Sequence, residues 1–132
     1  MLAADDQQKQ AKADLACTYS ELGYAEANTG ELTKGLADEQ KALAFYDTLG
    51  AAKSSNVFLL HDYAEALMRI GESCLLNPNR DSLRQGKAFL QRALNILQLM
   101  RDRRTLAAAD NSRIIEARAE LTQLGRRLLL AR

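Results

Sequence analysis

The chain contains 132 residues, of which 47% are hydrophobic and 27% charged, and its net charge is +1. This balance excludes a disordered chain, and the length allows one domain to bury a core without disulfide staples. A single proline, no tryptophan and an abundance of helix-forming residues exclude a β-rich fold. We therefore expect one all-α domain that spans residues 1–132.

Helical periodicity of the apolar residues divides the chain into five predicted helices. In chain order they cover about residues 5–27, 31–49, 56–76, 82–103 and 111–131. Side chains that can cap a first turn stand at four of the five starts: Asp5, Ser55 or Asn56, Asp81 or Ser82, and Asp110 or Ser112. The expected stops are NTG at 28–30, Gly50 and the Asn77–Pro78 pair. Because the connections are short, successive helices should pack as antiparallel neighbours.

An internal repeat relates alternate helices. The first, third and fifth helices contain YSELG at 19–23, LMRIG at 67–71 and LTQLG at 121–125. The second and fourth contain GLADEQKAL at 35–43 and GKAFLQRAL at 86–94. A repeated helix pair is typical of an α-solenoid. Glycine weakens a helix, so its recurrence predicts positions where the partner helix approaches closely.

This alternation resembles the tetratricopeptide repeat (TPR), whose first helix carries a large apolar residue followed by Leu-Gly and whose second carries small residues and an Ala-Leu pair. The matching positions are Tyr19, Leu22, Gly23, Gly35, Ala42 and Leu43, then Leu67, Ile70, Gly71, Gly86, Ala93 and Leu94. Leu121, Leu124 and Gly125 open a third pair without its second helix. The sequence departs from the family in its period, about 50 rather than 34 residues. It also has Glu26 and Cys74 where an aromatic residue is usual. The resemblance implies a solenoid of two helix pairs and a C-terminal capping helix.

In TPR arrays the first helix of each pair lines a concave groove, so the resemblance implies a module that binds a peptide or protein partner. The implied groove residues flank the packing positions: Cys17, Ser20, Tyr24, Ala27, Glu65, Met68, Glu72, Thr122 and Arg126. Tyr24 and Met68 suit apolar contacts, whereas the charged members would set the charge preference. The Lys/Asn carboxylate clamp of chaperone-tail-binding members is missing, so that ligand is not expected.

Residues 92–121 show a narrower resemblance. They are similar to the end of the TPR arrays that follow the kinase domain in some bacterial serine/threonine protein kinases. This resemblance implies a regulatory or sensor array that belongs to a longer protein. The sequence itself has no Gly-rich phosphate loop, no HRD and no DFG motif.

No motif in the sequence predicts catalysis. His61 is the only histidine, and no second His or nearby Cys gives it the spacing of metal ligands. Cys17 and Cys74 lack a CxxC or Cys/His pattern, so we expect them to be reduced and buried. The sequence therefore predicts a protein that is not an enzyme and has no cofactor and no metal site.

Arginines gather in the second half of the chain. Arg101, Arg103 and Arg104 stand at the predicted end of the fourth helix, where they would stabilise the negative end of its dipole. The alternative is a basic patch that binds phosphate groups or an acidic partner. Its members would be Arg101, Arg103, Arg104, Arg126, Arg127 and Arg132. Nucleic acid is the less favoured ligand, because aromatic side chains for base stacking are scarce.

Charge is divided unevenly along the chain. Residues 1–66 hold 5 basic and 11 acidic residues, whereas residues 67–132 hold 13 basic and 6 acidic ones. Such a solenoid can associate head to tail, and Leu128, Leu129 and Leu130 would offer a second copy an apolar surface. The competing interpretation is a capping helix whose leucines face its own core. The acidic N-terminus does not resemble a signal peptide, so we expect a cytoplasmic protein without a membrane segment.

Overall fold

The computed structural model of the protein describes residues 4–130, except for the side chain of residue 109. Its helices are α1 (Ala4–Asn28), α2 (Leu32–Thr48), α3 (Val57–Cys74), α4 (Arg80–Asp102) and α5 (Asn111–Leu130), with two short 3-10 helices, η1 (Ala51–Lys53) and η2 (Ala108–Asp110). No strand occurs among residues 4–130. The expected all-α fold of five helices is confirmed.

The helix starts follow the predicted capping chemistry at one position and depart from it at another. The Asn56 side chain accepts hydrogen bonds from the backbone N–H groups of Phe58 and Leu59, as expected for the cap of α3. The cap of α4 is Asn79, so the prediction of Asp81 or Ser82 was wrong. These two residues instead donate their backbone N–H groups to the Asn79 side chain. The helix begins earlier because a side chain just after the proline already satisfies its first turn.

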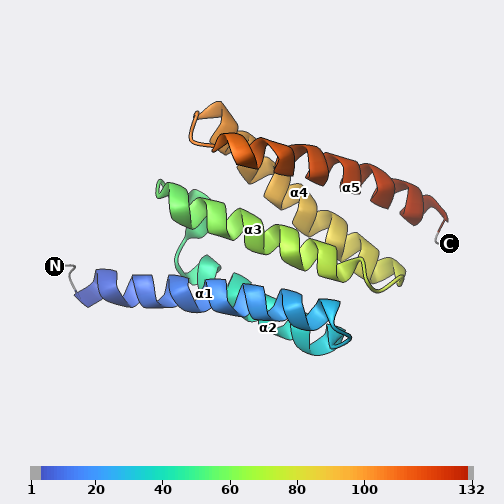
Figure 1. The fold of residues 1–132 in the computed structure, drawn as a ribbon, viewed down its shortest axis with the longest axis horizontal. Helices are drawn as coiled ribbons and strands as arrows, with labels where there is room; N and C mark the ends of the chain where they lie inside the picture. The colour runs from blue at the N-terminus through green and yellow to red at the C-terminus, as the bar shows by residue number, and fades with distance from the viewer. Residues whose placement is uncertain (1–3, 131–132) are drawn as a thin grey trace.

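The five helices form two layers (Figure 1). α1, α3 and α5 run in the same direction in one layer, and α2 and α4 run in the opposite direction behind them. α1 packs against α2, α3 against α4, and α5 against α4, while α3 also contacts α1 and α2. We call the outer surface of α1, α3 and α5 the odd-helix face.

Glycines set the closest approach in both complete helix pairs. A Cβ atom added at Gly23 would lie 2.5 Å from the carbonyl oxygen of Gly35 in α2. One added at Gly86 in α4 would lie 3.0 Å from the carbonyl oxygen of Gly71 in α3. A Cβ at the equivalent Gly125 in α5 would meet no atom within 4 Å among the described residues, apart from its chain neighbours and the backbone of its own helix. The prediction of close approach is therefore confirmed for the two complete pairs and wrong for α5, whose glycine has no helix against it.

The core lies between the two layers and is centred on α3. Leu67, Met68 and Ile70 of α3 have no exposed surface, and the rings of Tyr46 and Tyr63 pack against one another with centroids 5.6 Å apart. The buried side chains of α4 and α5 extend this core towards the C-terminus. The apolar interior thus consists of a large cluster around α3 and a smaller one between α4 and α5, and Leu121 packs against both.

Candidate functional site

Polar contacts join α1 to α3 across the odd-helix face. The Tyr24 hydroxyl donates a hydrogen bond of 2.7 Å to Glu72, and the Arg69 guanidinium donates one of 3.2 Å to the Ser20 hydroxyl. The bond to Glu72 and partial burial raise the pKa of Tyr24 to about 12. Tyr24 is therefore a neutral donor at physiological pH and fixes the Glu72 carboxylate between the two helices.

An ion pair joins α3 to α5 on the same face. Arg113 donates two hydrogen bonds to Glu65, of 2.9 and 2.8 Å, and a third of 2.8 Å to Glu116. These carboxylates raise the pKa of Arg113 above its usual range. Nearby, burial and the Glu72 charge raise the pKa of Glu120 to about 7. The paired Arg113 is thus surrounded by carboxylates.

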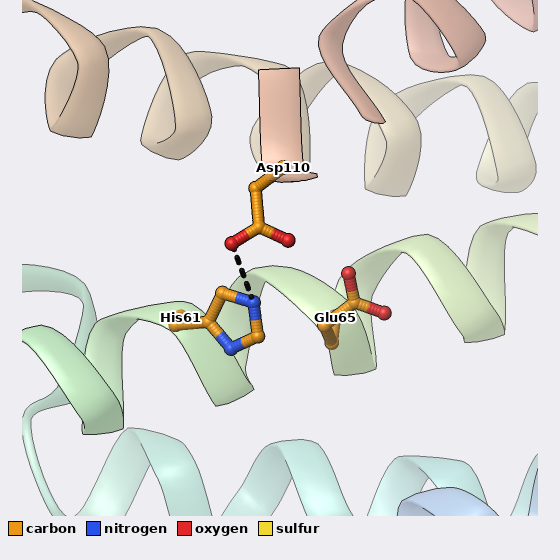
Figure 2. A group of neighbouring side chains, drawn as sticks. All are labelled: His61, Glu65 and Asp110. Atoms are coloured by element: carbon orange, nitrogen blue, oxygen red, sulfur yellow. Dashed lines mark ion pairs between the residues drawn. The ribbon is translucent and has the colours of Figure 1, made fainter. Parts of the chain in front are cut away.

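A cavity of about 270 Å³ opens between α1 and α3. It is lined by Cys17, Glu21, Tyr46, His61, Asp62, Glu65, Arg69 and Asp110. At its edge the His61 Nε2 atom lies 3.3 Å from an Asp110 carboxylate oxygen, and Nδ1 lies 3.4 Å from Asp62. Figure 2 shows His61 and Glu65 on neighbouring turns of α3, facing Asp110 from η2. One atom of each of these three side chains lies within 4.8 Å of the others.

A larger cavity, of about 440 Å³, lies beside the first half of α1 and the start of α3. Asp62 lines both cavities, and Asp6, Lys9, Leu59 and Phe58 also line this one. The Phe58 side chain is 82% exposed although it is large and apolar. The two cavities therefore adjoin and combine carboxylates with an accessible aromatic ring.

Three of the predicted groove residues do not reach the surface. Ser20, Ala27 and Met68 are buried, so their prediction as partner contacts is corrected. Ala27 is covered because α2 approaches α1 so closely at the glycine crossing, where Ala27 lies against Gly35. Ser20 is buried where the Arg69 guanidinium of α3 donates to its hydroxyl. Met68 belongs to the core around α3.

The other predicted groove residues keep some surface. Cys17, Tyr24, Glu65 and Glu72 are half-buried on α1 and α3 and lie among the contacts described above. Thr122 and Arg126 of α5 are exposed, and the Thr122 hydroxyl donates to the Arg118 carbonyl of its own helix.

The predicted basic patch is divided in the structure. Arg101, Arg103 and Arg104 are exposed where α4 ends, next to the connection that leads to α5. Arg127 is exposed near the other end of α5, about 24 Å further along that helix at 1.5 Å per residue. The prediction of one patch that includes Arg127 is therefore wrong, and Arg132 lies outside the described residues. Arg104 has the left-handed backbone conformation (φ 58°) of a helix-terminating residue.

Sequence reasoning missed a buried carboxyl group at the first glycine crossing. Glu39 of α2 is 1% exposed, and the Ser73 hydroxyl of α3 donates a 2.6 Å hydrogen bond to it. Burial raises the pKa of Glu39 to about 7. No local pattern marks this residue, because its helix neighbours resemble those of an exposed polar face.

The cysteines do not form a reactive pair. Both are free thiols, and Cys74 is buried whereas Cys17 is half-buried. Burial raises the pKa of Cys74 to about 11, and burial together with Glu21 raises that of Cys17. Both thiols are therefore protonated, weak nucleophiles at neutral pH.

Comparison with protein-family models, curated proteins and solved structures found no significant match to this chain. Among residues 4–130, none of the helices combines the length and the apolar character that crossing a membrane requires.

Proposed function

We propose that the chain is a non-catalytic binding module of the TPR-like solenoid type, which holds a peptide or protein partner on its odd-helix face. The observation that carries the proposal is the pair of adjoining cavities on this face, which share Asp62. Phe58 offers an accessible aromatic surface next to them, and aromatic side chains contribute much of the energy of protein interfaces.

The charge of the face indicates the chemistry of the partner. Carboxylates outnumber cations around the two cavities and the adjoining contacts. They are Asp6, Glu21, Asp62, Glu65, Glu72, Asp110, Glu116 and Glu120, against Lys9, Arg69 and Arg113. A segment with Lys or Arg next to apolar side chains would be complementary to this surface.

Selection from a library of random peptides tests the proposal. We expect the enriched peptides to carry net positive charge and at least one large apolar residue. Asp6→Lys and Glu21→Lys, which reverse exposed charges at the two cavities, should weaken their binding at least about tenfold. The matched controls Glu31→Lys and Asp81→Lys reverse exposed charges elsewhere and should leave binding unchanged. Failure to enrich peptides, or equal binding by all four variants, contradicts the proposal.

A second candidate function, self-association, is favoured by the surface of α5. Ile115, Leu129 and Leu130 are 68%, 71% and 85% exposed, and the space at Gly125 is open. Light scattering at low and high salt tests this function, with Leu129→Lys as the variant that should restore a monomer. A monomer at both salt concentrations contradicts it.

The predicted association of this chain with a bacterial serine/threonine kinase remains a proposal that the gene context would test.

A further inference from the structure

We propose that His61, Glu65 and Asp110 form a binding site for a divalent transition-metal ion of the Zn²⁺ class. The sequence predicted no metal site because its ligands are not clustered along the chain. His61 and Glu65 are four residues apart on α3, whereas Asp110 comes from the connection between α4 and α5. The fold brings one donor atom of each within 4.8 Å of the others (Figure 2).

The spacing of the donor atoms suits a small ion. A tetrahedral Zn²⁺ site with bonds of about 2.0 to 2.1 Å places neighbouring donor atoms about 3.3 Å apart. His61 Nε2 and the Asp110 oxygen are 3.3 Å apart. The Glu65 donor atom lies within 4.8 Å of the other two, so a metal ion would have to draw it closer to complete the third contact. The adjoining cavity leaves a fourth position open to water.

The surroundings orient the donors as metal sites require. A ligating histidine usually has its second ring nitrogen beside a carboxylate, and the His61 Nδ1 atom lies 3.4 Å from Asp62. Arg113 holds the Glu65 carboxylate with two hydrogen bonds, while each carboxylate oxygen keeps a further lone pair for a metal. The Arg113 charge is balanced by Glu116 as well as by Glu65, so it does not leave the site positive.

The donor types select the ion. One imidazole and two carboxylates suit Zn²⁺ and neighbouring transition metals, whereas Ca²⁺ takes six to eight oxygen ligands and Mg²⁺ an octahedral oxygen shell. A bound ion would join α3 to the connection before α5 and so fix the last helix of the odd-helix face. This inference does not depend on which partner that face holds.

Titration of the full chain with ZnCl₂ tests the site, by calorimetry and by thermal unfolding on protein without a polyhistidine tag. We expect one Zn²⁺ per chain, a higher Tm with Zn²⁺, and no shift with Ca²⁺ or Mg²⁺. His61→Gln and Asp110→Asn should each weaken Zn²⁺ binding at least about tenfold, and Asp62→Asn about tenfold through the loss of orientation. Circular dichroism of each apo variant confirms that the helices remain.

Two matched controls make the result decisive. Asp81→Asn removes an exposed carboxylate at the start of α4, and Cys17→Ser removes the thiol that lines the same cavity. Both should bind Zn²⁺ like the unaltered chain. The inference is overturned if the chain does not bind Zn²⁺, or if His61→Gln and Asp110→Asn bind it unchanged. It is also overturned if Cys17→Ser alone abolishes binding, because the thiol would then be the ligand.

Discussion

The two complete helix pairs and α5 carry a glycine in the same sequence context, yet its surroundings differ in all three. At Gly23 the atoms that a Cβ would meet include backbone atoms of Gly35 and Glu39 at 2.5 and 2.8 Å. At Gly71 the nearest atoms belong to the flexible Leu90 side chain, at 2.8 and 3.0 Å. At Gly125 no atom that the structure describes beyond its own stretch of helix lies within 4 Å of the added Cβ. The glycine of the same motif is therefore tightly packed against backbone atoms in α1, packed against a movable side chain in α3, and open to space in α5.

The two crossings also differ in the residue that covers the glycine. Glu39 and Leu90 occupy the same position of the even-helix repeat, and each lies against the glycine of its odd helix. The second pair thus has an apolar crossing, whereas the first has buried a carboxyl group.

The largest effect is expected from Gly35→Ala. The added methyl group would overlap backbone atoms of α1, among them the Ala27 nitrogen at 2.6 Å, and backbone atoms cannot rotate away. We expect a loss of about 3 kcal/mol in the free energy of unfolding, measured by urea denaturation. A loss below about 1 kcal/mol would show that α1 and α2 can separate easily.

Next in size is the pH dependence that Glu39 brings to the first crossing. Its pKa of about 7 in the fold exceeds the usual value for Glu, so the fold favours the protonated carboxyl group. The stabilisation is complete below the unfolded-state pKa and is lost as the pH rises through about 7. Glu39→Gln keeps an acceptor for Ser73 but cannot ionise. At about pH 8 this variant should be more stable than the unaltered chain, by on the order of 3 kcal/mol, and about equal near pH 4.

Urea denaturation across this pH range measures the effect. Glu31→Gln is the matched control, because it makes the same change at an exposed carboxylate and should give no pH-dependent gain in stability. The difference between the Glu39→Gln variant and the unaltered chain isolates the first crossing. A difference that does not change with pH would mean that the pKa of Glu39 is the same in the folded and unfolded chain, which contradicts the prediction.

A smaller loss is expected from Gly71→Ala in the second pair. The Leu90 side chain can move by a rotamer change, and the Gly86 carbonyl oxygen is 3.3 Å from the added Cβ. The gain in helix propensity offsets part of the packing cost, so we expect a net loss of about 1 kcal/mol or less. A loss equal to that of Gly35→Ala would remove the distinction between the two crossings.

The smallest effect, and the one of opposite sign, is expected from Gly125→Ala. With no neighbour at this position, alanine should stabilise α5 by about 0.5 to 1 kcal/mol through its helix propensity. Thermal or urea unfolding at a low protein concentration measures it. If a helix of a second copy packs on Gly125 in solution, the same substitution should instead weaken the dimer, which light scattering would detect.

The sequence predicted the parts of this fold that recur at short range. Apolar periodicity placed the five helices, and the repeated YSELG and LMRIG stretches identified Gly23 and Gly71 as packing positions. The exact helix start at Asn79 was missed, because several residues in that stretch can cap a helix. Helix propensity and the spacing of the repeat thus suffice to predict where the helices lie and which of them pair.

The candidate site was much harder to predict, since it depends on which face of each helix is covered. Met68 was expected on a groove because it flanks the packing residues, but α3 is covered by helices on several sides and buries it. The approach of Asp110 to His61 depends on how the connection before α5 folds back. Phe58 was overlooked because a large apolar residue is normally assigned to the core.

The contacts of the odd-helix face also have a consequence for the order of folding. The glycine crossings join segments that are close in sequence, whereas Tyr24–Glu72 and Glu65–Arg113 each join residues 48 positions apart. Closing a longer loop costs more chain entropy, so the hairpins should form first and the layer of α1, α3 and α5 last. Replacing the Tyr24 or the Glu65 side chain by that of alanine should then accelerate unfolding with little change in the folding rate. A nascent chain would then acquire the surface proposed to hold a partner only on completing its fold.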